Sequence, residues 1–257
     1  MSTKKRLIFA LLYNEGHFCQ SRNFRLQKVG MYDWLFNNYN FSHIAEYLDE
    51  LVVINVNPSD QNEDDFLAQV KKIVSKVFIP VAIGGGIKNV DNAKKAFNSG
   101  ADKVILNSLV RESIIDCKKI IDVYGSQSVV GSIDYKTIDN TDYIYDWKYN
   151  TINQNIDLQE YIKKCEDLGF GEILINSVNR DGTGFGYDID SINRIESYCN
   201  LPLMVMGGAG SLNHFKPTFK IPNVDACVTA NLLNFIGDAL QNVRHGLLEE
   251  KIDLAKF

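Results

Sequence analysis

Short runs of apolar residues alternate along this chain with segments whose apolar residues recur at helical spacing. In residues 63–78, for example, Phe66, Val70 and Ile73 lie three or four positions apart, which is the period of one helix face. The apolar runs between such segments are typical of buried strands. We expect strands at residues 6–12, 51–56, 79–86, 103–107, 128–134, 172–177, 201–210 and 225–231.

Strands that alternate with helices in this way imply parallel strands joined by helical crossovers. Eight such units in 257 residues predict a closed (β/α)8 or TIM barrel, with an open doubly wound sheet as the alternative. We expect one domain over residues 1–257, with a polar insert near 135–156 that forms a hairpin-like loop. Residues 84–108 and 207–231 each run from a glycine turn through a helix and an Asp to a strand, so we expect duplicated half-barrels.

The first predicted strand begins with a charge and ends with a leucine. Its inward-facing side chains should be every second residue, namely Arg6, Ile8, Ala10 and Leu12. Catalytic groups of a TIM barrel lie where the strands end, and nothing requires a charge where they begin. This order is therefore the reverse of what an enzyme site at the barrel mouth requires.

Composition excludes several classes of partner. The formal net charge is −5 and basic residues occur only in short pairs, which argues against nucleic acid or an anionic membrane as the main partner. The apolar run near the N-terminus is too short for a signal peptide, and no run approaches a membrane span, so we expect a cytoplasmic protein. Five widely spaced cysteines and four histidines without ligand spacing predict reduced thiols, no metal site and no cofactor.

Glycine turns end the third and seventh predicted strands, and polar residues end the fourth and eighth. These residues are Gly84, Gly85, Gly207 and Gly208 in the turns, and Asn107, Ser108 and Asn231 beside them. Glycine lets the backbone approach an anion closely, and the next helix N-terminus offers unpaired N–H groups. The pattern predicts two phosphate sites on opposite sides of the mouth, and so a phosphate-bearing small molecule. Tight strand–helix turns alone would also require such glycines.

Two aspartates are candidates for contacts with a substrate. Asp134 ends the fifth strand in phase with Ser132, so its side chain should point into the mouth. Burying a carboxylate inside a barrel costs free energy, so such a residue usually has a function. This makes Asp134 the candidate catalytic residue. Asp181 and Gly182 follow the sixth strand in a glycine-rich loop, where an Asp is usually a turn former. A two-carboxylate mechanism needs a partner on the first strand, and Leu12 stands there.

Four segments together resemble the cyclase subunit of imidazole-glycerol-phosphate synthase. They are VFIPVAIGGGIKNVDNAKKAFNSGADKVILNS, GSQSVVGSID, GEILINSVNRDGTGFGYD and LPLMVMGGAGSLNHF. The resemblance covers nearly the whole chain and implies a (β/α)8 barrel whose substrate has two phosphate ends, held at the glycine turns. It also implies a glutaminase subunit docked on the N-terminal face, with ammonia travelling through the barrel core. Two aspartates of that family carry the lyase and cyclisation chemistry, and the one on the fifth strand matches Asp134, while the loop aspartate matches Asp181.

The chain departs from that family at residues that carry chemistry. Leu12 stands where the family has its first-strand aspartate, and a leucine can neither accept nor donate a proton. Gln20 replaces a lysine that contacts phosphate in the family. Asn55 and Asn231 replace an aspartate after the second strand and a serine after the eighth. The resemblance therefore implies that half of the acid–base pair is missing.

The opposite end of the predicted barrel keeps the family pattern. The family has a ring of four charges that gates ammonia there, and all four match: Arg6, Glu50, Lys103 and Glu172. Two positive and two negative groups can pair, so a stabilising ring of salt bridges without any transport is the alternative. An ammonia conduit also predicts that the core above the ring, including Ala10, Ala82 and Ile105, is small or apolar.

These residues favour a protein that has kept the conduit and changed the chemistry. The chain resembles a paralogous group, the glycosyl-amidation-associated cyclase-like proteins of surface-polysaccharide gene clusters, which carry two leucines at this place on the first strand. That resemblance implies a subunit that binds a glutaminase and passes ammonia to a separate sugar amidotransferase, which converts an acetamido to an acetamidino group. The alternatives are a working cyclase of histidine biosynthesis that tolerates Leu12, and a sister isomerase, which would also need the missing aspartate.

Overall fold

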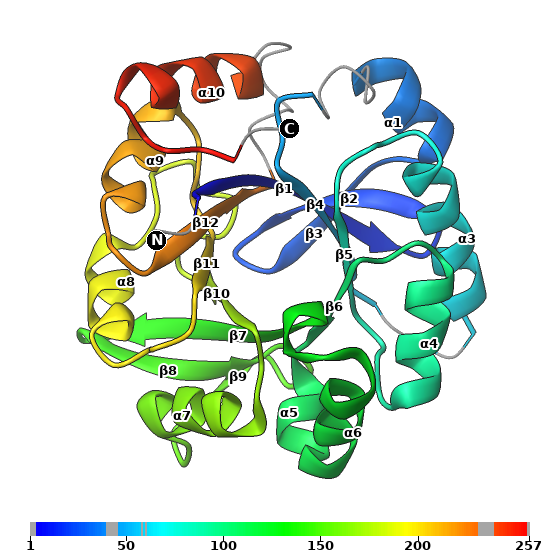
Figure 1. Ribbon diagram of the computed structural model, residues 1–257, viewed down its shortest axis with the longest axis horizontal. Helices are drawn as coiled ribbons and strands as arrows, with labels where there is room; N and C mark the ends of the chain where they lie inside the picture. The colour runs from blue at the N-terminus through cyan, green and yellow to red at the C-terminus, as the bar shows by residue number, and fades with distance from the viewer. Residues whose placement is uncertain (1–3, 40–45, 58, 60, 231–238, 256–257) are drawn as a thin grey trace.

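Parallel strands close into a barrel in the computed structural model, which describes residues 4–39, 46–57, 59, 61–230 and 239–255 (Figure 1). The barrel strands are β1 (Arg6–Asn14), β4 (Glu50–Asn55), β5 (Val81–Gly84), β6 (Lys103–Leu106), β7 (Val129–Ile138), β10 (Glu172–Ser177), β11 (Leu203–Met206) and β12 (Val224–Thr229). Around the barrel they follow the order β1-β4-β5-β6-β7-β10-β11-β12, and β12 pairs with β1. The predicted (β/α)8 barrel is confirmed, and the open sheet is wrong.

Helices form the outer layer of the barrel (Figure 1). They are α1 (Tyr32–Tyr39), α3 (Glu63–Val74), α4 (Val90–Asn98), α5 (Ser108–Glu112), α6 (Ile114–Tyr124), α7 (Leu158–Leu168), α8 (Ile189–Glu196), α9 (Leu212–Phe219) and α10 (Ala239–Glu249), with a short 3-10 helix at Ser126–Ser128. In α3 the spaced apolar residues Phe66, Val70 and Ile73 are buried, as the sequence predicts. Acidic residues in its first turn and lysines in its last turn suit the helix dipole.

The buried apolar residues that the structure describes form two clusters, one between the strands and the helices and one inside the barrel. We call the inner one the lumen cluster, and it consists of Ile8, Ala10, Leu12, Cys19, Val52, Ala82, Ile105, Val130, Leu174, Met204, Met206, Ala226 and Val228. Ile8, Ala10 and Leu12 alternate along β1 and all belong to it, as the period of two predicts. The lumen is thus mostly apolar, with the expected Ala10, Ala82 and Ile105 in it and the buried hydroxyl-bearing Ser132 on the same inward face of β7.

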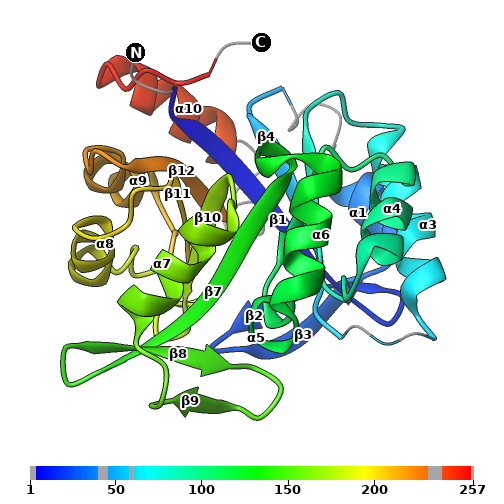
Figure 2. The ribbon, with the colours of Figure 1, turned by 60° about the horizontal axis from the view of Figure 1, so that its bottom comes forward.

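Two excursions extend the sheet beyond the barrel at the end where the strands finish, which we call the mouth (Figure 2). After β1 the chain forms a hairpin of β2 (His17–Arg22) and β3 (Arg25–Gly30), with β2 antiparallel to β1. Strand β7 continues to Ile138 and turns back into β8 (Thr141–Asp146), which pairs with β9 (Thr151–Asn153). The predicted hairpin-like insert is therefore an antiparallel sheet built onto β7.

Two predicted strands are too long. Strand β5 ends at Gly84 and β11 at Met206, short of the predicted ends at residues 86 and 210. The reason is backbone conformation, because Gly85, Gly86 and Gly207 have φ values of +88°, +79° and +104°, which no strand can continue. Among the described residues no helix is long and apolar enough to cross a membrane, and no group of three or more His, Cys, Asp or Glu is placed to hold a metal ion.

Candidate functional site

Along each of two barrel strands, the inward-facing side chains form a column whose chemical type changes from one end of the barrel to the other. On β6 the inward residues are Lys103, then Ile105, and Asn107 follows where the strand ends. On β10 the same positions are Glu172, Leu174 and Asn176. Each column therefore runs from a charge through an apolar layer to an amide, with the amide at the mouth.

The four charges at the start of the strands form a closed ring of ion pairs, which we call the charged ring. Arg6 contacts Glu50 at 2.8 Å (Nη1–Oε2) and Glu172 at 3.0 Å (Nη2–Oε1). Lys103 Nζ lies 3.0 Å from Glu50 Oε2 and 3.4 Å from Glu172 Oε2. Burial acts to lower the pKa of Arg6, but the attraction of Glu172 and Glu50 outweighs it and the pKa is raised. The structure thus brings the four side chains together, and their role as an ammonia gate stays a prediction.

The contacts within the charged ring are uneven. Glu50 is almost fully buried, with 2% of its side chain exposed, and its Oε2 accepts from both cations. Its other oxygen, Oε1, is buried and has no hydrogen-bond partner among the described residues. The longest contacts are those from Lys103 to the two oxygens of Glu172, both at 3.4 Å. The Lys103–Glu172 side is the weakest part of the ring.

Asp134 lies at the mouth end of β7, buried between two amides. Its Oδ2 accepts a hydrogen bond from Asn107 Nδ2 at 2.8 Å, and its Oδ1 accepts one from Asn176 Nδ2 at 2.9 Å. Burial raises the pKa of Asp134 to about 6, and these two hydrogen bonds limit the rise. Asp134 therefore points inward as predicted, and it titrates close to neutral pH, where a group can exchange protons.

A second layer of contacts fixes the amide of Asn107. Arg111 Nη1 donates to Asn107 Oδ1 at 3.4 Å, and Arg111 Nη2 lies 3.4 Å from Asp146 Oδ2 on β8. The insert thus holds Arg111, which in turn orients Asn107 toward Asp134. Sequence reasoning missed Asn176, Arg111 and Asp146. The inward phase shared by Glu172 and Asn176 was the one available signal.

Leu12 takes the place that a second acid–base group would need. It ends the inward column of β1, its side chain is 5% exposed, and β1 lies four strands away from β7 around the barrel. Its neighbours across the sheet are Cys19 on β2 and Ile54 on β4. Leu12 therefore places an apolar side chain on the barrel wall opposite the Asp134 carboxylate.

Asp181 contacts the hairpin of β2 and β3. Its Oδ2 accepts from Ser21 Oγ at 2.5 Å and from the backbone N–H of Phe24 at 2.8 Å, and its carbonyl oxygen accepts from the N–H of Asn23 at 3.0 Å. Burial raises the pKa of Asp181 in spite of these bonds. The loop is pressed against the hairpin, since a Cβ on Gly182 would lie 2.1 Å from the carbonyl oxygen of Ser21. Substrate contact by Asp181 and Gly182 stays a prediction.

The hairpin of β2 and β3 reaches across the mouth. It leaves the barrel on β1, and its turn at Asn23 and Phe24 meets the loop after β10 and the insert after β7. The ring of Phe24 packs edge-on against that of Tyr145 on β8, with centroids 5.3 Å apart. Cys19 of β2 belongs to the lumen cluster, so the underside of the hairpin packs onto the top of the lumen.

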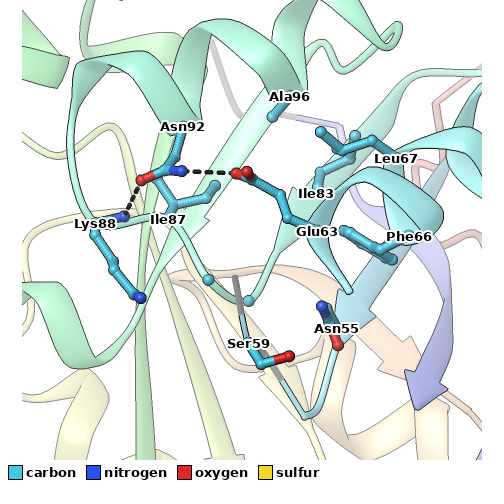
Figure 3. A pocket seen from close by; sticks show the side chains of 12 residues that line it. Asn55, Ser59, Glu63, Phe66, Leu67, Ile83, Ile87, Lys88, Asn92 and Ala96 are labelled. Carbon is cyan, nitrogen blue, oxygen red and sulfur yellow. Dashed lines mark hydrogen bonds between the residues drawn. The ribbon is translucent and has the colours of Figure 1, made fainter. Parts of the chain in front are cut away.

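The glycine turns have a packing reason of their own. At Gly85 a Cβ would lie 2.0 Å from the carbonyl oxygen of Asn55, and at Gly208 one would lie 2.1 Å from that of Gly186. Behind the first turn is a pocket of about 20 Å³, room for roughly one water molecule, where Asn92 Nδ2 donates to Glu63 Oε1 (Figure 3). Close packing alone thus requires glycine, and the phosphate sites stay predictions. Ser108 begins α5 beside Asn107, and Asn231 lies outside the described residues.

Comparison with known proteins gives the family. Residues 36–237 match the family model described as "Histidine biosynthesis protein". The chain is 40% identical over 243 residues to "Putative imidazole glycerol phosphate synthase subunit hisF2" of Parasynechococcus marenigrum, covering 93% of this chain and 88% of that relative. It is 35% identical to imidazole glycerol phosphate synthase subunit HisF of Saccharolobus solfataricus, with 90% and 91% covered. The same subunit of Clostridium botulinum is 34% identical, with 96% of both chains covered. With its barrel, this family match and these relatives, the chain belongs to the histidine biosynthesis protein family and is similar to its HisF subunits.

Proposed function

We propose that this chain is the barrel subunit of a glutamine amidotransferase complex, which receives ammonia from a glutaminase and delivers it at the mouth to a separate enzyme. The observation that carries the proposal is Leu12, buried at the mouth where the acid–base partner of Asp134 would stand. Losing one of two acid–base groups costs about 10²–10⁴-fold in rate. The chemistry at the mouth is thus weakened, while the charged ring is complete.

The lumen suits the passage of a small neutral molecule. From Lys103 to Asn107 the chain advances by four residues, or about 11 Å along a barrel axis to which strands tilt by about 36°. Apart from Ser132, the side chains between are apolar, and moving an ion from water into an apolar medium has an idealised cost of about 20 kcal/mol. Ammonia can cross this layer, whereas ammonium and other ions are excluded.

The N-terminal face offers a docking surface for the glutaminase. Phe78 stands between α3 and β5, at the same end of the barrel as the charged ring, and its side chain is 95% exposed. An aromatic side chain this exposed is a good anchor for a protein partner. Ammonia released there by the glutaminase would meet the charged ring, where the 3.4 Å contacts from Lys103 to Glu172 are the easiest to part.

The mouth offers a second apolar surface. Exposed apolar side chains lie on several of the segments that follow the strands, namely Leu26, Met31, Trp34, Ile138, Tyr149 and Phe185. We propose that a separate amidotransferase binds here and uses the ammonia to convert the acetamido group of a sugar to an acetamidino group for surface-polysaccharide synthesis. The two phosphate sites would bind a phosphate-bearing small molecule. We place the complex in the cytoplasm, where the five cysteines, all buried and unbridged, stay reduced.

A working cyclase of histidine biosynthesis is the second candidate, and Asp134 favours it. This carboxylate is held by two amides, has a pKa of about 6, and would be one of the two acid–base groups of that reaction. The relatives that carry the cyclase-subunit name support this reading as well.

One experiment separates the two functions. The protein is mixed with a candidate glutaminase subunit, and cyclase turnover is measured with glutamine and with ammonium chloride. We expect stimulated glutamine hydrolysis and almost no cyclisation from either nitrogen source, and Leu12→Asp should restore some cyclisation. Turnover at family-like rates by the unchanged protein would reject the proposal, and so would a glutaminase whose activity does not respond to this subunit.

A further inference from the structure

The two amides beside Asp134 have a fixed orientation. A carboxylate only accepts hydrogen bonds, so both Asn107 and Asn176 must turn their NH2 groups toward it. Each amide oxygen is then left for a donor other than Asp134. That of Asn107 accepts from Arg111, whereas Asn176 Oδ1 is buried and has no hydrogen-bond partner among the described residues. A buried acceptor without a donor is costly, which indicates that something donates to it.

Asp134 also lacks a direct counter-ion. Within the described residues no Lys or Arg makes an ion pair with it, and Arg111, whose positive charge acts on it, is held by Asn107 and Asp146. A buried carboxylate whose partners are neutral amides keeps most of its charge uncompensated. The site therefore offers negative charge and an oxygen without a hydrogen-bond donor. A small cation that donates hydrogen bonds and accepts none would match it.

We propose that Asp134 and Asn176 form a binding site for ammonium at the top of the lumen, with the amide oxygen of Asn176 and the carboxylate of Asp134 as its acceptors. Ammonium is small, positive and carries donors only. The inference rests on the proposed function as the source of the ammonia, and it adds a place where that ammonia is held before transfer. The side chain beside Asn176 across the sheet is Met206 of the lumen cluster, whose flexible thioether can move aside for a ligand of this size.

The site explains why the chain keeps Asp134 without a partner aspartate. Ammonia that has crossed the apolar layer takes a proton from the Asp134 carboxyl, so an N–H bond forms, the O–H bond breaks, and ammonium stays paired with the carboxylate. Return of that proton to Asp134 frees ammonia with its lone pair available for attack. A pKa of about 6 leaves the carboxyl able to do both near neutral pH.

The test uses the full chain and measures its thermal midpoint in ammonium chloride, potassium chloride or tetramethylammonium chloride at constant ionic strength. Ligand binding to the folded state raises the midpoint in a saturable way. We expect saturation with ammonium and a smaller response to potassium, an ion of similar size that cannot donate. Asn176→Leu should weaken the apparent ammonium affinity about tenfold or more, Asp134→Asn should abolish the response, and Asn193→Ala, on the exposed face of α8, should leave it unchanged.

The same measurement can overturn the proposal. An equal response to potassium and ammonium would mean a general cation site, and no saturable response would mean that only water satisfies Asn176. Either result rejects ammonium binding while leaving glutaminase stimulation intact as evidence for the proposed function. Conversely, ammonium binding without any effect on a glutaminase would reject the proposed function and keep the site. If the variants fail to fold by circular dichroism, competition between ¹⁵N-ammonium and potassium, followed by NMR on the unchanged protein, decides the same question.

Discussion

Removing one cation from the charged ring should destabilise the barrel by an amount that its contacts allow us to estimate. Lys103→Met keeps the length and apolar packing of the side chain and deletes only the ammonium group. Glu50, 2% exposed, then loses its 3.0 Å contact with Lys103 and keeps the 2.8 Å contact with Arg6. The change therefore weakens the compensation of a buried charge without removing it.

The expected magnitude follows from these contacts. Breaking a fully buried ion pair costs about 3–5 kcal/mol. Because Lys103 is 16% exposed and Glu50 keeps Arg6, we expect roughly half of that, about 2 kcal/mol. For a chain of this size, that corresponds to a fall in the thermal midpoint of about 4–8 °C.

The assay is urea unfolding followed by circular dichroism for Lys103→Met, Glu172→Gln and the double variant. The double variant leaves the Arg6–Glu50 pair with one charge of each sign, so its loss of stability should be smaller than the sum of the single losses by at least 0.5 kcal/mol or so. Lys118→Met, which breaks an exposed pair with Asp122 on α6, is the matched control and should change little. Additive losses in the double variant would refute the idea that the four charges act as one ring.

Three further predictions concern the mouth and its turns. The folded-state pKa of Asp134, about 6, lies above the ordinary 3.8, so the folded state binds the extra proton between these values and wild-type stability falls as pH rises from 4 to 6. Asp134→Asn removes this loss. In urea titrations, the free energy of unfolding of the variant relative to wild type should therefore rise by about 3 kcal/mol between pH 4 and 6 and stay level above pH 7. A difference between variant and wild type that does not change with pH would contradict the raised pKa. Ser21→Ala deletes a hydrogen bond to the buried Asp181 carboxylate. Trypsin should then cut the hairpin of β2 and β3 about tenfold faster, at Arg22, Arg25 or Lys28. Unchanged cleavage would mean that Asp181 does not hold the hairpin in place. Gly208→Ala should lower the midpoint of urea unfolding far more than Gly125→Ala. Both glycines have positive φ, but only at Gly208 would the added Cβ lie 2.1 Å from a carbonyl oxygen. Equal losses of stability in the two variants would show that this close approach costs nothing.

The spacing of apolar residues was enough to predict the barrel, because the buried face of each strand and helix carries apolar residues at a regular period. The inward set of β1 and the charges at the starts of β4, β6 and β10 follow from a period of two, which a barrel strand obeys strictly. The ends of β5 and β11 were less predictable, since strand propensity continued into glycines whose positive φ breaks the strand. Likewise, the length of β7 depends on pairing with β8, which no local pattern reveals.

The candidate site was predictable where one strand carries the residue and less so where partners come from distant segments. Asp134 and Asn107 point inward as their strands dictate. The contact of Asp181 with Ser21 and Phe24 depends on how far the hairpin of β2 and β3 reaches, which hydrophobic spacing does not report. The role of Arg111 depends in the same way on Asp146, a residue of the insert.

The hairpin that spans the mouth links early and late parts of the chain. Ser21 and Asp181, which are bonded to each other, lie 160 positions apart in the sequence. Contacts between residues so far apart in sequence are slow to form, because most of the intervening chain must be ordered, at a cost in entropy, before the contact contributes any stability. Although the hairpin is among the first segments to be synthesised, its tip can dock only after the strands through β10 are in place. Protection of the amide hydrogens of Asn23 and Phe24 from exchange should therefore appear late in refolding, and it would mark a barrel that has already closed.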